Sequence, residues 1–196
     1  LHGAPNFKEI MLEKKSLAEL LSYDRMFIDG AISFDTIVTV ANKIDVSKNN
    51  TSPLVIFLSS HGGDIQHGLS VGFILRESPR EIIVVNMGYC ESIALAIVAM
   101  AKPGNRYSMV SSSFFIHSVK ITTDETIDWS LGRLCAETND VQILSDKLIS
   151  CLESTTKMNK RTILDLMVAN NGFGTFIQSK EALEYGIIDH IIDFGE

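Results

Sequence analysis

The chain contains 196 residues, of which 45% are hydrophobic and 21% are charged, and this composition is typical of one compact globular domain. The net charge of −7 disfavours nucleic acid and anionic membranes as partners. Three cysteines without Cys-x-x-Cys spacing predict neither a zinc site nor a disulfide framework, so we expect reduced thiols in a cytoplasmic protein. No apolar run reaches the roughly 18 residues of a membrane span, and the first residues do not resemble a signal peptide.

The N-terminal half begins with a mixed segment and then becomes regular. Residues 1–20 combine charged and apolar side chains, and we expect an N-terminal arm there, followed by a single domain over 21–196. A short strand is predicted at Arg25–Gly30, and apolar residues at helical spacing predict a helix from Phe34 to about Val46. The continuous apolar run Leu54–Leu58 is typical of a strand buried on both faces.

Two strand-to-helix steps follow this buried strand. Gly62-Gly63 forms a turn that leads into a helix ending at about Glu77. A strand over 81–85 is followed by a second expected glycine turn at Gly88, and Ser92 then opens a helix that is apolar on every side. This alternation predicts a mostly parallel sheet whose ligands bind at the carboxyl ends of its strands.

The C-terminal half contains one unusually long helix. Strands are predicted at 106–109 and 113–116, and a loop or exposed strand at 118–126. The helix predicted over about 127–155 would extend roughly 40 Å, which exceeds what one small domain can cover. We therefore expect it to pack between subunits along an apolar seam formed by Leu131, Leu134, Val141, Leu144, Leu148 and Leu152.

The chain ends in short elements. Asn159 is expected to cap a helix that runs to Met167, and a loop follows at 170–174. A short helix is predicted at 179–185 with Gly186 at its end, after which 187–189 returns to the sheet.

Three features fall on the same edge of the predicted sheet and suggest acyl-transfer chemistry. Ser92 heads the apolar helix, His117 ends a buried strand, and Gly63 lies in the first glycine turn. A serine hydroxyl becomes a nucleophile when an imidazole takes its proton. The backbone N–H groups of Gly63 and Ile93 are candidates for holding the oxyanion that forms.

Each feature also has a simpler structural interpretation. A serine at the start of a helix is usually its N-cap, and a histidine at a strand end is often a hydrogen-bonded structural residue. A Gly-Gly turn before a helix can hold a phosphate, although Gly62-Gly63 lacks the lysine of a P-loop. The remaining histidines show no metal-site spacing.

The order of the motifs resembles the proteolytic subunits of Clp protease. The segments that carry the resemblance are Ser59-x-x-Gly62-Gly63, Gly88-x-x-x-Ser92, Gly104-Asn105-Arg106-Tyr107-Ser108, Phe115-Ile116-His117 and the closing segment Phe176–Asp189. It extends from about Ser16 to Ile192.

The resemblance implies an α/β crotonase-like fold, a parallel sheet of ββα repeats with a protruding handle helix at about 127–155. It implies a serine endopeptidase in which Ser92 is the nucleophile, His117 the general base, and Gly63 and Ile93 the oxyanion donors. It also implies heptameric rings, of one or two kinds of subunit, stacked as a tetradecamer, unfolded polypeptide substrates, and a separate AAA+ unfoldase. No cofactor or metal is implied for this chain.

The sequence departs from the family pattern beside these residues. Aligning the closing segment puts Gly174 where the family has the triad aspartate, whereas aligning the preceding helix puts Asn170 there. We therefore expect Asn170 or Asn171 to replace the aspartate, which removes the charge that stabilises imidazolium. His61 stands in place of a proline and Glu91 in place of a small residue.

Two other functions are compatible with the residues. A chain without the triad carboxylate could be a structural or regulatory subunit of the same complex, with little or no turnover. The glycine turns alone would also suit a crotonase-fold acyl-CoA enzyme, although the pairing of Ser92 with His117 argues against it.

Overall fold

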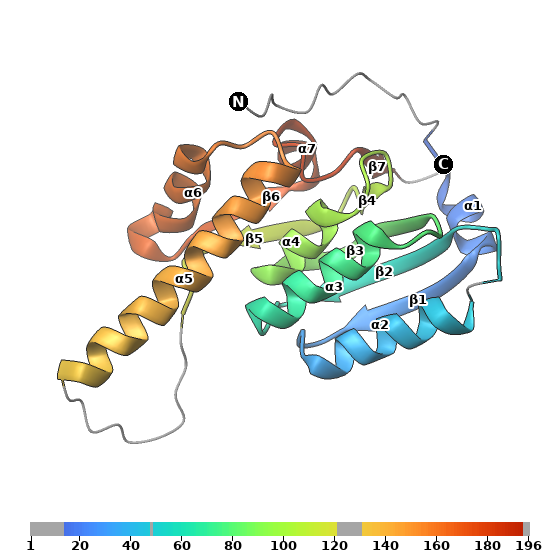
Figure 1. Ribbon diagram of the computed structural model, residues 1–196. Coiled ribbons are helices and arrows are strands. Elements are labelled where there is room, and N and C mark those ends of the chain that lie inside the picture. The colour runs from blue at the N-terminus through green and yellow to red at the C-terminus, as the bar shows by residue number, and fades with distance from the viewer. Residues whose placement is uncertain (1–13, 48, 121–130, 194–196) are drawn as a thin grey trace, which may run out of the picture.

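The computed structural model describes residues 14–47, 49–120 and 131–193, within which the strands form one seven-stranded sheet (Figure 1). The strands are β1 (Asp24–Asp29), β2 (Leu54–Ser60), β3 (Ile82–Glu91), β4 (Arg106–Met109), β5 (Ser113–Ile116), β6 (Thr175–Gln178) and β7 (His190–Ile192). The helices are α1 (Leu17–Ser22), α2 (Phe34–Val46), α3 (Ile65–Glu77), α4 (Ile93–Met100), α5 (Leu131–Thr155), α6 (Lys160–Gly172) and α7 (Ser179–Glu184).

The sheet is mostly parallel, as predicted. The strand order is β1-β2-β3-β4-β7 with parallel pairing throughout, and β5 pairs in parallel with the end of β3. The helices α2, α3 and α4 cover one face of this sheet (Figure 1). The α/β class and the parallel sheet of the sequence-based prediction are therefore confirmed.

Strand β2 shows why the fold has two layers of core. Its alternate residues Leu54, Ile56 and Leu58 face the main cluster, which includes all the apolar residues of α4 but Met100. Val55 and Phe57 point to the opposite face, where Leu20 of α1 packs on them. The continuous apolar run is thus a strand buried on both faces, as a two-sided parallel sheet requires.

The expected glycine turn at Gly88 is wrong, because Gly88 lies inside β3. Strand β3 pairs with β4 as far as Asn86 and then with β5 from Tyr89 onward. The Asn86 side chain links the two parts: it donates to the carbonyl of Ser113 at 2.9 Å and accepts from the N–H of Gly88 at 3.1 Å. A change of partner within one strand leaves no periodic signal in the sequence.

Two C-terminal strands differ from the predictions. The pair β5–β6 is antiparallel, and β6 was not predicted. The return to the sheet expected at 187–189 occurs three residues later, at β7. The reason is that the N–H of Ile187 bonds to the carbonyl of Ala182 at 2.9 Å, while the Asp189 carboxylate binds the Arg106 guanidinium at 2.5 Å. These contacts hold residues 187–189 outside the ladder.

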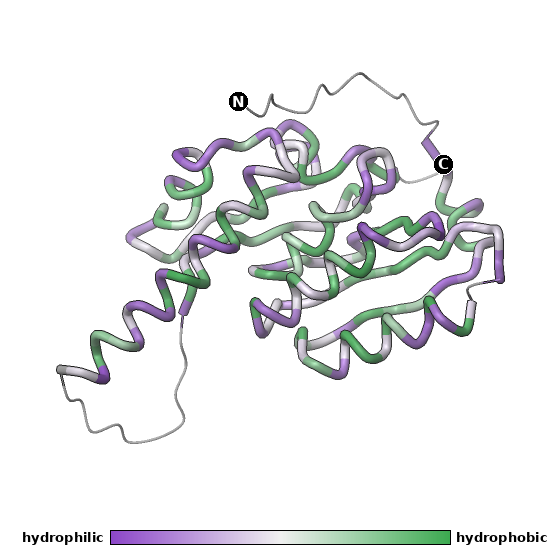
Figure 2. The backbone as a smooth tube through the Cα atoms, in the orientation of Figure 1, coloured by the Kyte–Doolittle hydropathy of each residue, from purple (hydrophilic) through white to green (hydrophobic). Residues whose placement is uncertain are grey.

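Helix α5 protrudes from the body of the molecule (Figure 1). Its C-terminal part contributes Leu148 and Leu152 to the core, whereas the Leu134 side chain near the other end is 49% exposed. Apolar positions continue into the protruding part (Figure 2). The predicted long helix is confirmed from Leu131 onward, and residues 127–130 of the prediction lie outside the described residues.

The predicted N-terminal arm, 1–20, is described only from residue 14. Ser16 caps α1 by accepting from the N–H of Glu19 at 3.2 Å, and Leu20 is fully buried beneath the sheet. The domain boundary at 20–21 stays a prediction. Within the described residues, no helix combines the length and apolar character that crossing a membrane requires.

Candidate active site

Ser92 occupies a strained turn between β3 and α4. Its φ of 54° and ψ of −126° lie in a region of backbone conformation that residues other than glycine rarely adopt, at a cost of about 1–3 kcal/mol. Its N–H donates to the carbonyl of Phe115 on β5 at 2.8 Å. The Oγ makes no capping hydrogen bond to α4, so the N-cap interpretation of this serine finds no support.

The turn at Gly62-Gly63 lies directly against Ser92. A Cβ on Gly62 would lie 2.8 Å from Ser92 Cβ, and a Cβ on Gly63 would lie 2.3 Å from the carbonyl oxygen of Ile32. Positive φ angles of 94° and 153° add a conformational reason for glycine at both positions. The glycines are therefore required by close backbone packing.

The two predicted oxyanion donors have free N–H groups. In the β-bridge between Ile32 and Gly63, the Ile32 N–H donates to the carbonyl of Gly62, and the Ile32 carbonyl accepts from the N–H of Asp64. The N–H of Gly63 takes part in neither hydrogen bond. Ile93 is the first residue of α4, where helical N–H groups have no intrahelical acceptor. No acceptor for either N–H is found within the described part of the chain.

His117 directly follows β5, the strand that pairs with the end of β3. Its Nδ1–H donates to the carbonyl of Ser118 at 2.7 Å, and its ring stacks on Phe115 with centroids 5.4 Å apart. A neutral imidazole with a proton on Nδ1 has a lone pair on Nε2, the form that a general base requires. No hydrogen bond joins His117 to Ser92 among the described residues.

The predicted third member, Asn170 or Asn171, is not hydrogen-bonded to His117. Both asparagines adopt left-handed conformations, with φ of 53° and 59°, where α6 loses its helical geometry. The amide of Asn170 donates to the carbonyl of Gly174 at 2.8 Å. In the described structure the imidazole is oriented by the Ser118 carbonyl instead, and the role of the asparagines stays a prediction.

Gly174 lies beside His117 and cannot carry a side chain in this conformation. Its φ is 114°, and an added Cβ would lie 2.3 Å from the carbonyl oxygen of Ile116 and 2.8 Å from His117 Cβ. One of the two positions that align with the family's aspartate therefore packs against the Cα and Cβ of His117. The carbonyl oxygen of Ile116 and the Cα of His117 occupy the space that a side chain at Gly174 would need.

The sequence-based analysis missed one contact at the nucleophile. The Nδ1–H of His61 donates to the Glu91 carboxylate at 2.9 Å, and the His61 ring stacks on Tyr89 with centroids 4.1 Å apart. Both His61 and Glu91 were noticed as departures from the family pattern. Nothing in the sequence indicates that they meet, because they lie 30 residues apart, His61 just after β2 and Glu91 at the end of β3.

No other strong nucleophile competes with Ser92 at this turn. Cys90 lies two residues before it, but burial, with a smaller contribution from the Glu91 charge, raises the pKa of this thiol well above its ordinary value. Its Sγ donates to the carbonyl of Leu58 at 3.7 Å. A thiol that stays protonated is inert.

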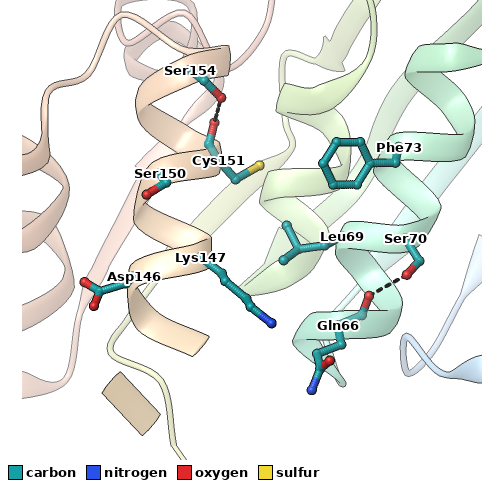
Figure 3. Close-up of a pocket in the computed structure, with 9 residues that line it drawn as sticks. All are labelled: Gln66, Leu69, Ser70, Phe73, Asp146, Lys147, Ser150, Cys151 and Ser154. Atoms are coloured by element: carbon teal, nitrogen blue, oxygen red, sulfur yellow. Dashed lines mark hydrogen bonds between the residues drawn. The ribbon is translucent and has the colours of Figure 1, made fainter. Parts of the chain in front are cut away.

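The site is separate from the groove between α3 and α5. That groove, of about 710 Å³, receives Leu69 and Phe73 from α3 and Lys147 and Cys151 from α5 (Figure 3). Phe73 is 58% exposed although it is a large apolar residue. Neither Ser92 nor His117 lines this groove, and the described residues include no cluster of three or more potential metal ligands.

Comparison with known proteins agrees with this geometry. The chain is 24% identical over 182 residues to the ATP-dependent Clp protease proteolytic subunit of Bdellovibrio bacteriovorus, covering 87% of this chain and 82% of the relative. It is 21% identical to proteolytic subunit 2 of Treponema pallidum, with coverage of 89% and 85%.

A solved structure of ClpP1 from Listeria monocytogenes, an asparagine-to-aspartate mutant, has the same fold. Its TM-score is 0.74 at 19% identity, with 91% of this chain and 96% of that chain covered. The sequence profile of Clp protease matches residues 10–194. This match spans nearly the whole chain, and the protein belongs to the Clp protease family of serine peptidases.

Proposed function

We propose that this chain is a serine endopeptidase subunit in which Ser92 attacks the peptide carbonyl of an unfolded polypeptide. The observation that carries the proposal is the strained Ser92 turn, which is hydrogen-bonded to the strand that ends at His117. In this mechanism the Nε2 of His117 takes the hydroxyl proton and later delivers it to the leaving amine. The Gly63 and Ile93 N–H groups stabilise the oxyanion of the tetrahedral intermediate.

The base in this mechanism has no carboxylate partner among the described residues. The Ser118 carbonyl holds the imidazole in the required tautomer, but it carries no full charge to stabilise the imidazolium. Loss of the triad carboxylate lowers kcat by about 10⁴ in a charge-dependent triad. This observation favours a second candidate, a subunit of the same complex that turns over slowly or not at all. The acyl-CoA alternative has no comparable support, since the chain belongs to a peptidase family.

A labelling experiment separates the two candidates. The serine endopeptidase predicts that a fluorophosphonate attaches to Ser92 of the wild type, that Ser92→Ala abolishes the adduct, and that His117→Ala slows its formation. Ser111→Ala is the matched control, because this exposed serine belongs to the loop between β4 and β5. An absent adduct on a folded, assembled wild type would establish the inactive subunit.

We also propose that the subunit acts in the cytoplasm, in stacked heptameric rings that receive unfolded chains from an ATP-driven unfoldase. The exposed Leu134 and Ile143 side chains on the protruding part of α5 support a partner along this helix. Sedimentation should give a mass of about fourteen subunits, the number that two stacked rings of seven contain. Leu134→Glu should reduce that mass, and Gln142→Glu, on an exposed polar position of the same helix, should not.

A further inference from the structure

Two turns follow the end of the ladder between β2 and β3: Gly62-Gly63, here called the oxyanion turn, and the turn at Ser92, here called the nucleophile turn. No backbone pairing connects these two turns. The last paired residues are Ser60 on β2 and Cys90 on β3. Beyond them the two strands leave the ladder, one into Gly62-Gly63 and the other into Ser92, and Gly62 packs against Ser92 without a backbone hydrogen bond between them. The relative position of the oxyanion donors and the nucleophile therefore depends on contacts past the ladder.

The contact between His61 and Glu91 lies one residue past the ladder on both strands. Its two partners are joined at 2.9 Å, and the Glu91 side chain is only 22% exposed. The His61 ring is 68% exposed but stacks on Tyr89 at an interplanar angle of 20°, which restricts the ring to one orientation. An exposed ion pair alone contributes little to stability. Here a stacked ring and a half-buried carboxylate restrain both partners.

The other hydrogen bonds of the oxyanion turn join it to segments other than the nucleophile turn. The N–H of Gly62 donates to Ser60 Oγ at 3.0 Å, which ties the turn to its own strand. Asp64 donates to the carbonyl of Ile32 at 2.9 Å, which ties it to the segment after β1. Among the side-chain hydrogen bonds of the described residues, the His61–Glu91 bond is the one that reaches the residue before the nucleophile.

We propose that His61 and Glu91 are positioning residues that clamp the oxyanion turn to the nucleophile turn, so that the Gly63 and Ile93 N–H groups converge beside Ser92. This inference rests on the proposed peptidase function. The clamp acts through the backbone, and neither side chain contacts the reacting atoms. A displacement of about 1 Å between donors and nucleophile can lower a rate by about 10²-fold, so a loose turn is costly.

The test uses the assembled full-length protein and two readouts. The first is hydrogen–deuterium exchange of residues 60–65, where the Gly62 and Asp64 N–H groups are hydrogen-bonded. Glu91→Ala should raise their exchange, and Glu91→Gln, which keeps an acceptor oxygen, should raise it less. Glu81→Ala is the matched control, because this exposed glutamate immediately precedes β3 at its other end.

The second readout is hydrolysis of a fluorogenic peptide. Glu91→Ala and His61→Ala should each lower kcat by about tenfold with KM within about twofold, since the substrate contacts are kept. The double variant should lose no more than either single variant, because the two residues act as one unit.

The outcomes distinguish this inference from the proposed function. Unchanged exchange in Glu91→Ala overturns the clamp whatever the activity. Raised exchange with unchanged kcat, in an active wild type, overturns its role in positioning the donors. Raised exchange in a protein whose wild type shows no turnover supports the clamp and refutes the proposed peptidase.

Discussion

The two sides of the candidate site are built in different ways. The nucleophile side consists of Ser92, the Gly62-Gly63 turn and helix α4, and its parts are so close that an added Cβ would collide with backbone. The base side consists of His117 and the loop at 169–174, in which Asn170 and Asn171 are exposed. Close backbone packing, to which the His61–Glu91 contact adds, shapes the first side, whereas the second depends on a few local hydrogen bonds.

This difference shows which side of the candidate site is firmly anchored and which side is held by few contacts. All eight residues of α4 are buried, so the helix that carries Ile93, the proposed oxyanion donor, is anchored over its whole length. The imidazole of His117 is held by a neighbouring carbonyl and an aromatic ring, and no carboxylate of the described residues is hydrogen-bonded to it. Three predictions test this contrast, from the largest expected effect to the smallest, and a fourth concerns a titrating group outside the site.

Gly63→Ala breaks the nucleophile side at its tightest contact. A Cβ would lie 2.3 Å from the carbonyl oxygen of Ile32, so the turn must move and its N–H with it. We expect kcat for a peptide substrate to fall about 10²- to 10³-fold, the cost of losing one oxyanion donor. Steady-state hydrolysis measures the effect, and circular dichroism checks that the variant is folded.

Gly132→Ala provides the matched control for this substitution. This glycine lies on the exposed part of α5, where an added Cβ meets nothing within 4 Å. The change should leave kcat unaltered and raise the free energy of unfolding by about 1 kcal/mol or less. An unchanged kcat in Gly63→Ala would contradict the oxyanion assignment.

Gly174→Asp tests whether the missing carboxylate can be restored at its aligned position. The side chain would start 2.3 Å from the carbonyl oxygen of Ile116, at a φ of 114°. We expect the free energy of unfolding to fall by about 2–4 kcal/mol without a gain in kcat, because strain and overpacking add. Urea unfolding measures the loss.

Asn171→Asp is the control for the added charge. Its φ of 59° is one that aspartate tolerates, and the side chain is exposed, so stability should change by less than about 0.5 kcal/mol. If Gly174→Asp raised kcat, the backbone of this loop would have to differ from the one described.

Asn170→Gly and Asn171→Gly separate the two candidates for the third triad position. Both substitutions keep the left-handed conformation, but the first removes the hydrogen bond from the Asn170 amide to Gly174. We expect Asn170→Gly to lower the free energy of unfolding by about 1 kcal/mol relative to Asn171→Gly. Thermal unfolding of the pair measures the difference. A larger loss of kcat in Asn171→Gly would instead assign that residue to His117.

The smallest effect concerns pH and lies away from the site. Burial lowers the pKa of His190 below its ordinary value, although the adjacent Asp189 charge opposes the shift. The unfolded chain therefore binds a proton that the folded chain does not. Stability is full above the ordinary value of about 6.5 and falls as the pH drops through it.

His190→Gln should reduce this slope, measured by urea unfolding from about pH 8 to about pH 5. The comparison indicates whether acid lability arises in the sheet or in the site. An identical slope in the variant would place the titrating group elsewhere.

Much of the architecture follows from local patterns. The apolar stripe from Phe34 to Val46 predicted α2 with the bounds observed, and the all-apolar run after Ser92 predicted a buried helix. Gly62, Gly63 and Ser92 could be singled out because turns at strand ends need special backbone geometry. The resemblance to Clp protease then assigned chemical roles that spacing alone left open.

Contacts between distant segments could not be predicted in this way. Strand β3 pairs with β4 up to Asn86 and with β5 from Tyr89, and the sequence of β3 carries no sign of either neighbour. The antiparallel strand β6 is short and half exposed, so it lacks the apolar run of a buried strand.

The sequence by itself determined the parallel α/β class and the long helix and singled out Ser92 and His117 as candidates for the site, because each depends on local periodicity or on a motif. Tertiary structure alone decided that an added side chain at Gly174 would collide with Ile116, that the Ser118 carbonyl holds His117, and that His61 meets Glu91. Those facts depend on distances between segments far apart in the chain, which only packing sets.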